Sequence, residues 1–404
     1  MSSKPRGQFL DRSTPPNIFT LILLAGISAL SMNIFLPSLP SMTAHFDTEY
    51  SVMQLSVAVY LGVNAVLQIL VGPISDKLGR RPVILGGMVL FLLATLGCIF
   101  APNVTLFLTF RMMQAAVVVA MVLSRAVVRD MVPADEAASM IGYVTMGMTI
   151  VPMLGPVFGG LLDQAFGWQA SFWLLFAVGL LILVLTWADL GETKQSSGLS
   201  LAKQFREYPE LLTSPRFWGY SLASGLSSGA FFAYLGGAPF VATNIYGLSP
   251  ALMGLYFGAP AVGYFIGNFL SGRYSVRFGI NRMVVAGCAI AAAGIGVLIL
   301  IVFGGAGSAE LFFGMMTFVG LGNGLTIPNA TSGALSVRPH LAGTASGLSG
   351  SIMIGGGAGL SALAGALLVP GSGPLPLLWI MFATSFAGFL TILAVIRRER
   401  RLHL

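Results

Sequence analysis

Apolar segments long enough to cross a membrane follow one another along almost the whole chain, and only short polar breaks separate them. A membrane-spanning helix needs roughly 20 apolar residues, and twelve segments of this kind can be counted. Charged residues make up 9% of the 404, against about 25% in ordinary soluble domains. The sequence therefore predicts an all-α polytopic membrane protein with twelve transmembrane helices. The predicted spans are 17–40, 51–72, 82–101, 103–127, 138–162, 168–189, 215–243, 250–272, 282–304, 309–335, 341–369 and 374–396.

The basic residues gather on one side of this predicted topology. If the spans alternate in direction, twenty of the twenty-one Lys and Arg residues fall in the same set of loops and chain ends, and the opposite loops contain none. Loops rich in Lys and Arg lie in the cytoplasm under the positive-inside rule. We therefore expect both termini to be cytoplasmic. The formal charge of +7 follows from this topology and does not indicate a nucleic-acid partner.

The longest polar break divides the chain into two similar halves. It runs from Gly191 to Ser214 and is too polar to insert into a membrane. We expect a first six-helix half at 1–190, a cytoplasmic linker at 191–214 and a second six-helix half at 215–404. Several residue types recur at an offset of 200, which favours a duplication. The matching pairs include Gly72 and Gly272, Ser75 and Ser275, Gly79 and Gly279, Gly155 and Gly355, and Gly159 and Gly359.

A polar stretch between the second and third spans, GPISDKLGRRPVI at 72–84, resembles the signature loop of the major facilitator superfamily. Its glycines and proline predict a short turn, with Pro82 starting the next helix, where its missing N–H costs nothing. In that family the aspartate, here Asp76, pairs with cationic groups of neighbouring spans; capping of a short loop helix is the alternative. The resemblance implies two halves related by a pseudo-two-fold axis along the membrane normal. The expected hinge residues are Gly72, Asp76, Gly79, Arg80, Arg81, Arg129 and Asp130.

The predicted fifth span resembles the glycine motif associated with exporters of the same superfamily. Glycines four residues apart allow a neighbouring helix to approach closely, and prolines bend the helix. The alternative is a helix that is simply tightly packed. Gly347, Gly355 and Gly359 repeat the ridge in the eleventh span, and the resemblance implies that the halves rock at these glycines. The motif residues are Gly142, Gly147, Gly155, Pro156, Gly159 and Gly160.

The first span, with its segment SALSMNIFLPSLP, and the stretch SRAVVRD that closes the fourth resemble bicyclomycin-resistance (Bcr/CflA-type) drug exporters. This resemblance covers the whole chain and implies a multidrug efflux transporter of the bacterial inner membrane, driven by protons. One departure concerns the first span, where the family commonly has an aspartate and this chain has Asn33. The aspartate is a candidate for binding protons and cationic drugs, so both properties are in question for this chain.

A row of polar residues at intervals of four marks the second span: Ser56, Tyr60, Asn64 and Gln68. Polar groups in a membrane usually face the interior of the bundle. We expect this row to face the other half or a water-filled cavity, and hydrogen bonding between helices is an equal alternative.

Arg111 is the one basic residue that the topology places inside the membrane. With Gln114 it resembles the superfamily's arginine, two residues, glutamine motif, in which the arginine faces the cavity and is linked to proton exchange. We expect Asn33, Gln114 and the polar row of the second span as its neighbours. The alternative is an arginine that snorkels to the membrane surface.

Three classes of function remain to be weighed. The first is an exporter of small, mostly apolar molecules, with the proton as coupling ion, acting as a monomer without cofactor. The second is an uptake symporter for a nutrient. The third, a membrane enzyme, needs convergent His, Cys, Asp or Glu side chains at one membrane depth. Neither such a set nor a metal-ligand spacing is found in the sequence, so we expect a transporter of small molecules and not an enzyme.

Overall fold

The structure is a computed structural model that describes residues 9–131, 144, 151, 154–193, 208–338 and 342–401. Within these residues all regular secondary structure is helical. The first half contains α1 (Ile18–Asn33), η1 (Leu36–Ser38), α2 (Leu39–His45), α3 (Tyr50–Leu78), α4 (Arg80–Ile99), α5 (Val104–Gln114), η2 (Ala115–Val117), α6 (Val118–Met131), a helix at 154–166 and α8 (Gln169–Asp189). Helix α10 (Tyr208–Leu212) lies in the predicted linker, and the second half contains α11 (Pro215–Phe240), η3 (Val241–Ile245), α12 (Pro250–Tyr256), α13 (Ala259–Phe278), α14 (Ile280–Phe303), α15 (Ala309–Ser336), α16 (Ala342–Leu367) and α17 (Leu375–Arg401).

Ten helical segments of the described chain are long and apolar enough to cross a membrane. They coincide with ten of the predicted spans, so the prediction of an all-α polytopic membrane protein is confirmed. The predicted fifth span, 138–162, lies largely outside the described residues. The seventh corresponds to α11, most of whose 26 residues are small and buried, which lowers its hydropathy.

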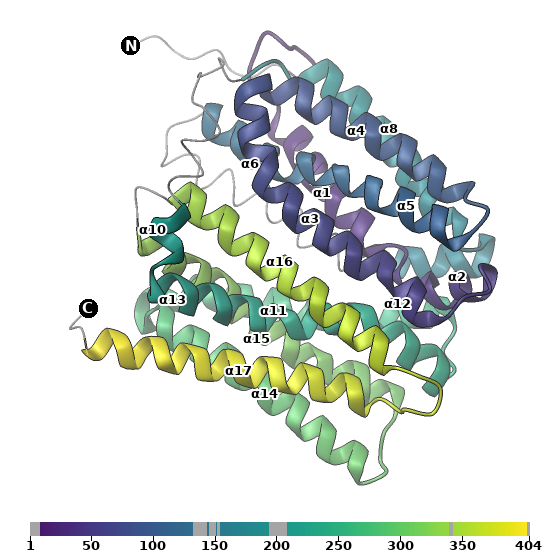
Figure 1. The fold of residues 1–404 in the computed structure, drawn as a ribbon, viewed down its shortest axis with the longest axis vertical. Coiled ribbons are helices and arrows are strands. Elements are labelled where there is room, and N and C mark those ends of the chain that lie inside the picture. Colours follow the sequence, from purple (N-terminus) through teal and green to yellow (C-terminus); the bar gives the residue numbers. More distant parts are fainter. Residues whose placement is uncertain are drawn as a thin grey trace.

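The helices form two groups that lie side by side (Figure 1). In the first half, α4 packs against α5 and α8, and α1 packs against α6 and α8. In the second half, α15 packs against α13 and α14, and α11 packs against α16 and α17. Between the halves, α3 packs along α16, and η1 contacts α11 and α12.

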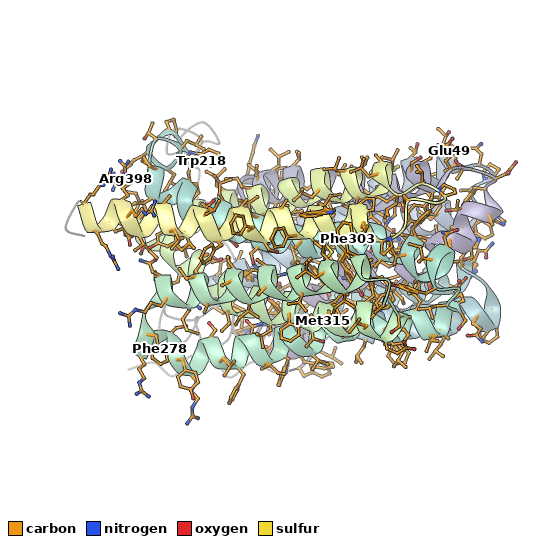
Figure 2. All side chains as sticks on the ribbon, turned by 90° about the horizontal axis from the view of Figure 1, so that it is seen from below. Glu49, Trp218, Phe278, Phe303, Met315 and Arg398 are labelled. Carbon is orange, nitrogen blue, oxygen red and sulfur yellow. The ribbon has the colours of Figure 1, made fainter. Side chains whose placement is uncertain are left out.

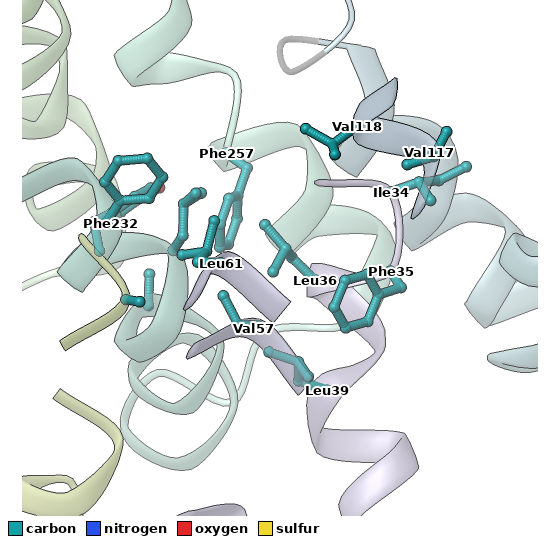
Figure 3. Packing of buried hydrophobic residues seen from close by; sticks show 14 of the residues in the cluster. Ile34, Phe35, Leu36, Leu39, Val57, Leu61, Val117, Val118, Phe232 and Phe257 are labelled. Carbon is teal, nitrogen blue, oxygen red and sulfur yellow. The ribbon is translucent and has the colours of Figure 1, made fainter. Parts of the chain in front are cut away.

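The long helices share one direction, so the bundle has two ends (Figure 2). Glu49 lies at one end, and Phe278 and Arg398 lie at the other. Following the expected topology, we call these the outer and inner ends. One hydrophobic cluster includes residues of both halves, with Leu36 and Leu61 near Phe232 and Phe257 (Figure 3). A second cluster joins Leu211 of the linker to residues of the second half.

The polar stretch at 72–84 differs from the expected turn. Helix α3 continues to Leu78 and α4 begins at Arg80, so Gly79 alone separates them. Gly79 has φ of +97°, a conformation that glycine adopts without steric cost. Pro82 is therefore the third residue of α4 rather than its first. The turn is short, as predicted, but the prediction that Pro82 starts the next helix is wrong, because one glycine in this conformation is enough to reverse the chain and α4 already begins at Arg80.

The first span is also not one continuous helix. Helix α1 ends at Asn33, and the chain continues through η1 into α2. Pro37 and Pro40 have no N–H to donate to the carbonyls four residues earlier, which prevents an uninterrupted helix over 17–40. The fourth span is similarly divided into α5 and α6 by η2.

Candidate functional site

Arg111 lies in the last turn of α5 and is completely buried, with 0% of its side chain exposed. It is the largest fully buried side chain among the described residues. The alternative of an arginine that snorkels to the surface is therefore excluded, and the guanidinium must be stabilised inside the protein.

Main-chain and amide oxygens surround the guanidinium. Nη2 donates to the Ser31 carbonyl at 2.9 Å and Nε donates to the Ser56 carbonyl at 3.3 Å. Nη1 donates to the Ser31 hydroxyl and to Oε1 of Gln114. Gln114 is held in turn, because its Nε2 donates to the Thr95 hydroxyl at 2.8 Å. The arginine thereby connects α1, α3 and α5, and Thr95 adds α4.

Two aromatic rings cover the faces of the guanidinium. Its central carbon lies 3.9 Å from the ring centroid of Tyr60 and 4.3 Å from that of Phe35. The electron-rich face of an aromatic ring attracts a cation. The Tyr60 hydroxyl also donates to the Ser31 hydroxyl at 3.4 Å. The charge is therefore enclosed by rings and fixed dipoles.

The charge of Arg111 is stabilised without a carboxylate, since it takes part in none of the salt bridges of the described chain. Ser31 belongs to the last turn of α1, whose carbonyls lack helical donors. The C-terminal end of a helix carries a partial negative charge that favours cations. The break in α1 therefore supplies both a free carbonyl and a favourable potential to Arg111.

The expected neighbours of Arg111 are brought together only in part. Gln114, Tyr60 and Ser56 bind it, but Asn33 is not among its hydrogen-bond partners, since its Nδ2 donates to the Ala29 carbonyl at 2.7 Å. The expectation for Asn33 is therefore wrong: α1 ends there, and the side chain folds back onto its own helix.

Asn64 and Gln68 hydrogen-bond to each other and not to Arg111. Gln68 Nε2 donates to Asn64 Oδ1 at 2.8 Å. A β-carbon added to Gly350 of α16 would lie 3.4 Å from Gln68 Oε1. The part of the polar row formed by Asn64 and Gln68 therefore faces the other half and does not belong to the cluster around Arg111.

The halves meet closely at the outer end. The Tyr50 hydroxyl donates to the Gly236 carbonyl at 2.7 Å, and Gln54 Nε2 donates to the Ser361 hydroxyl at 2.7 Å. A β-carbon on Gly236 or Gly365 would overlap the Gln54 amide. Gln54 therefore fills a niche of small residues in the opposite half.

The glycines of the fifth span make close contacts at the same end. A β-carbon on Gly159 would overlap the Ile34 carbonyl, and one on Gly160 would overlap the Pro250 carbonyl of the other half. A β-carbon on Gly155 would lie 3.5 Å from Leu30 of α1, and one on Gly254 of α12 would overlap the Pro156 carbonyl. Gly142 and Gly147 lie outside the described residues.

The eleventh span does not repeat this packing. A β-carbon on Gly359 or Gly347 would have no neighbour within 4 Å, and one on Gly355 would reach Ala65 at 3.7 Å. The expectation that the two glycine ridges make equivalent close contacts is therefore wrong in this conformation, because α3 packs along α16 without approaching Gly359 closely.

At the inner end, a charged network joins α3, α4, α6 and the segment after α8. Arg80 Nε forms a 3.0 Å salt bridge with Asp130, and its Nη1 donates to Ser75. Glu192 accepts from the backbone N–H groups of Arg80 and Arg81 at 2.8 and 3.1 Å. The side chains of Asp76 and Arg129 lie outside the described residues. Around Gly72 the added β-carbon would meet nothing within 4 Å.

Comparison with known proteins places this architecture. The sequence matches the model of the Major Facilitator Superfamily over residues 21–362. The chain belongs to this superfamily. It is 30% identical to multidrug resistance protein D of Escherichia coli (strain K12), over 89% of this chain and 91% of that one. It is also 30% identical to a chloramphenicol resistance protein of Pseudomonas aeruginosa (80% and 78%), and 28% identical to a bicyclomycin resistance protein homolog of Haemophilus influenzae (90% and 92%).

Solved structures share the fold of this chain. The peptide transporter POT in complex with sulfate gives a TM-score of 0.75 and 14% identity, covering 98% of this chain and 96% of that one. The xylose transporter XylE from E. coli, in a partially occluded inward-open conformation, gives a TM-score of 0.71 and 15% identity, covering 93% and 97%. These similarities show the fold of a multi-pass transporter. The resemblance to the superfamily and its drug-exporter branch, drawn from the motifs, is confirmed.

Asp163 is a buried acid that the sequence does not reveal, because it does not lie in the middle of a predicted span. Asp163 lies just beyond the predicted fifth span, with 8% of its surface exposed. The Ser41 hydroxyl lies 3.0 and 3.1 Å from its two oxygens. Burial raises the pKa of the Asp163 carboxyl above its ordinary value, and the hydrogen bond from Ser41 opposes this only partly. Its position at a span end conceals its burial in the sequence.

Proposed function

We propose that this protein exports small, mostly lipophilic molecules, drugs among them, across the bacterial inner membrane by alternating access and in exchange for protons. We place both termini in the cytoplasm and treat 191–214 as the linker between two six-helix halves. We expect a monomer that needs no cofactor. Relatives named for resistance to chloramphenicol, to bicyclomycin and to several drugs support this class of substrate.

The observation that carries the proposal is the buried charge of Arg111. A positive charge this deep, held by carbonyls and rings and without a carboxylate partner among the described residues, repels a cationic substrate that comes near it. At about 8 Å and an effective dielectric constant of about 20, the repulsion is about 2 kcal/mol, or roughly thirtyfold in affinity. We therefore expect neutral compounds rich in amides or carbonyls to be exported better than permanent cations.

Proton exchange needs a group that titrates, and Asn33 cannot supply it. We propose Asp163 as the proton-accepting group of the first half. Its burial and its raised pKa mean that it takes up a proton at a higher pH than an exposed aspartate does. His45, on the same short helix as Ser41, packs edge-on against Trp168, which follows this segment.

Transport into everted membrane vesicles tests the proposal. A pH gradient should drive uptake of a neutral amide such as chloramphenicol, and a protonophore should abolish it. Ethidium uptake should be weaker. We expect Asp163→Asn to abolish gradient-driven uptake and to leave exchange of labelled for unlabelled substrate intact. Robust ethidium transport, or chloramphenicol uptake that ignores the gradient, contradicts the proposal.

A further inference from the structure

A groove of about 380 Å³ lies at the inner end between α14 and α17, well away from Arg111. Three arginines line it: Arg282 from the first turn of α14, and Arg397 and Arg400 from the last turns of α17. The rest of the lining is apolar, from Val285, Ala286, Leu393 and Ile396. The groove therefore combines a strongly positive rim with an apolar wall.

The three guanidinium groups have no acidic partner in the described chain. None of them takes part in its salt bridges, and all three are exposed. Glu399, the acid next to them on α17, is buried and turned to the interior. It binds Arg216, the Tyr220 hydroxyl and Asn281. The positive charge at the rim is therefore not neutralised by this neighbour.

The start of α14 adds to this positive potential. In the first half, the carboxylate of Glu192 accepts from the first backbone N–H groups of α4. At the equivalent position, α14 follows Gly279, and no side chain of the described residues caps it. A β-carbon on Gly279 would have no neighbour within 4 Å. An uncapped helix N-terminus favours an anion.

The level of the groove along the spans indicates which kind of anion it binds. Both α14 and α17 are long and apolar enough to cross a membrane. The arginines lie in the first turn of α14 and the last turns of α17, at the inner end where Figure 2 labels Phe278 and Arg398. Long basic side chains at this level reach the headgroup region, while the apolar wall continues along the spans. Basic pockets between spans on the cytoplasmic side bind acidic headgroups.

We propose that this groove binds the headgroup of one anionic phospholipid of the phosphatidylglycerol or cardiolipin type. Arg282, Arg397 and Arg400 contact the phosphodiester, and an acyl chain lies along Val285 and Leu393. The bound lipid joins the inner ends of α14 and α17 from the outside, opposite to Glu399, which joins them to α11 from the inside. The inference rests on the embedding in a membrane and does not depend on the direction or substrate of transport.

Native mass spectrometry of the delipidated full-length protein tests the site. Phosphatidylglycerol is titrated in mixed micelles, and the fraction of protein that carries one lipid is measured. Each arginine near an anionic surface is worth about fivefold in binding. We expect Arg282→Gln and Arg400→Gln each to raise the half-saturating lipid fraction about fivefold, and the triple variant with Arg397→Gln on the order of 100-fold.

Arg398→Gln is the matched control, because it removes the same charge from the same helix and does not line the groove. It should change binding less than twofold. Phosphatidylcholine with the same acyl chains should bind weakly, and free glycerol phosphate should not compete. Equal loss in Arg398→Gln, equal binding of phosphatidylcholine, unchanged binding in the single variants, or displacement by glycerol phosphate overturns the proposal. Because no transport is measured, this outcome is independent of the proposed export.

Discussion

Replacing Arg111 by alanine removes the cation on which four helices converge. The change leaves the Ser31 carbonyl and Gln114 Oε1 buried without a donor, at about 2 kcal/mol each, and loses two cation–π contacts at about 1 kcal/mol each. It also removes the cost of placing a charge in the membrane, about 3 kcal/mol on insertion scales. The net effect is a loss of about 3 kcal/mol in the free energy of unfolding.

Thermal unfolding in detergent and transport in everted vesicles measure the two consequences separately. We expect Arg111→Ala to unfold at a clearly lower temperature and to lose transport. Arg111→Lys keeps the charge but not the forked geometry that serves Ser31, Ser56 and Gln114 at once, so it should retain only part of both. Arg398→Ala, an exposed arginine at the inner end, serves as the control and should match the unaltered protein. An Arg111→Ala variant that unfolds and transports normally refutes the reasoning.

Three further predictions concern the contacts between and within the halves. Gln54→Ala removes the hydrogen bond to Ser361 and should destabilise the state with the outer end closed by about 1–2 kcal/mol. Distances between spin labels on the outer loops should then report more of the outward-open state. An unchanged distance distribution contradicts this. Gly160→Leu should block outer closure and transport, because Pro250 occupies the space of its side chain, whereas Gly359→Leu should transport normally. Glu192→Gln should lower the unfolding free energy by about 1 kcal/mol. Thermal unfolding measures this against Asp47→Asn, an exposed acid whose side chain makes no hydrogen bond or salt bridge in the described chain.

The sequence predicts the spans well because a run of about 20 apolar residues has few alternatives to a membrane helix. It also identifies Arg111 and Gln114, since a charge and an amide stand out in an apolar segment. The other members of the cluster could not be found in this way. Ser31 and Thr95 are small hydroxyl residues that occur in many spans, and Ser31 contributes mainly a carbonyl, which every residue has.

Predictions failed where the direction of a side chain depends on an irregular backbone. A four-residue spacing places Asn64 and Gln68 near Tyr60 only if the row stays straight, but each step drifts about 40° around a helix of 3.6 residues per turn. The row therefore turns from Arg111 towards α16. Glu192 was missed for another reason, because its role depends on Gly79, which lies more than a hundred residues away in the sequence.

The break in α1 connects the buried charge to the contact between the halves. Because α1 ends at Asn33, the Ser31 carbonyl is free to bind Arg111. The same break redirects the chain into η1, which contacts α11 and α12 of the other half, and places Leu36 in the cluster shared by both halves (Figure 3). Opening of the outer end must therefore move the segment that begins at Ser31. A change in the charge around Arg111 and a movement of the halves thus act on one short piece of backbone, which is the physical requirement for coupling them.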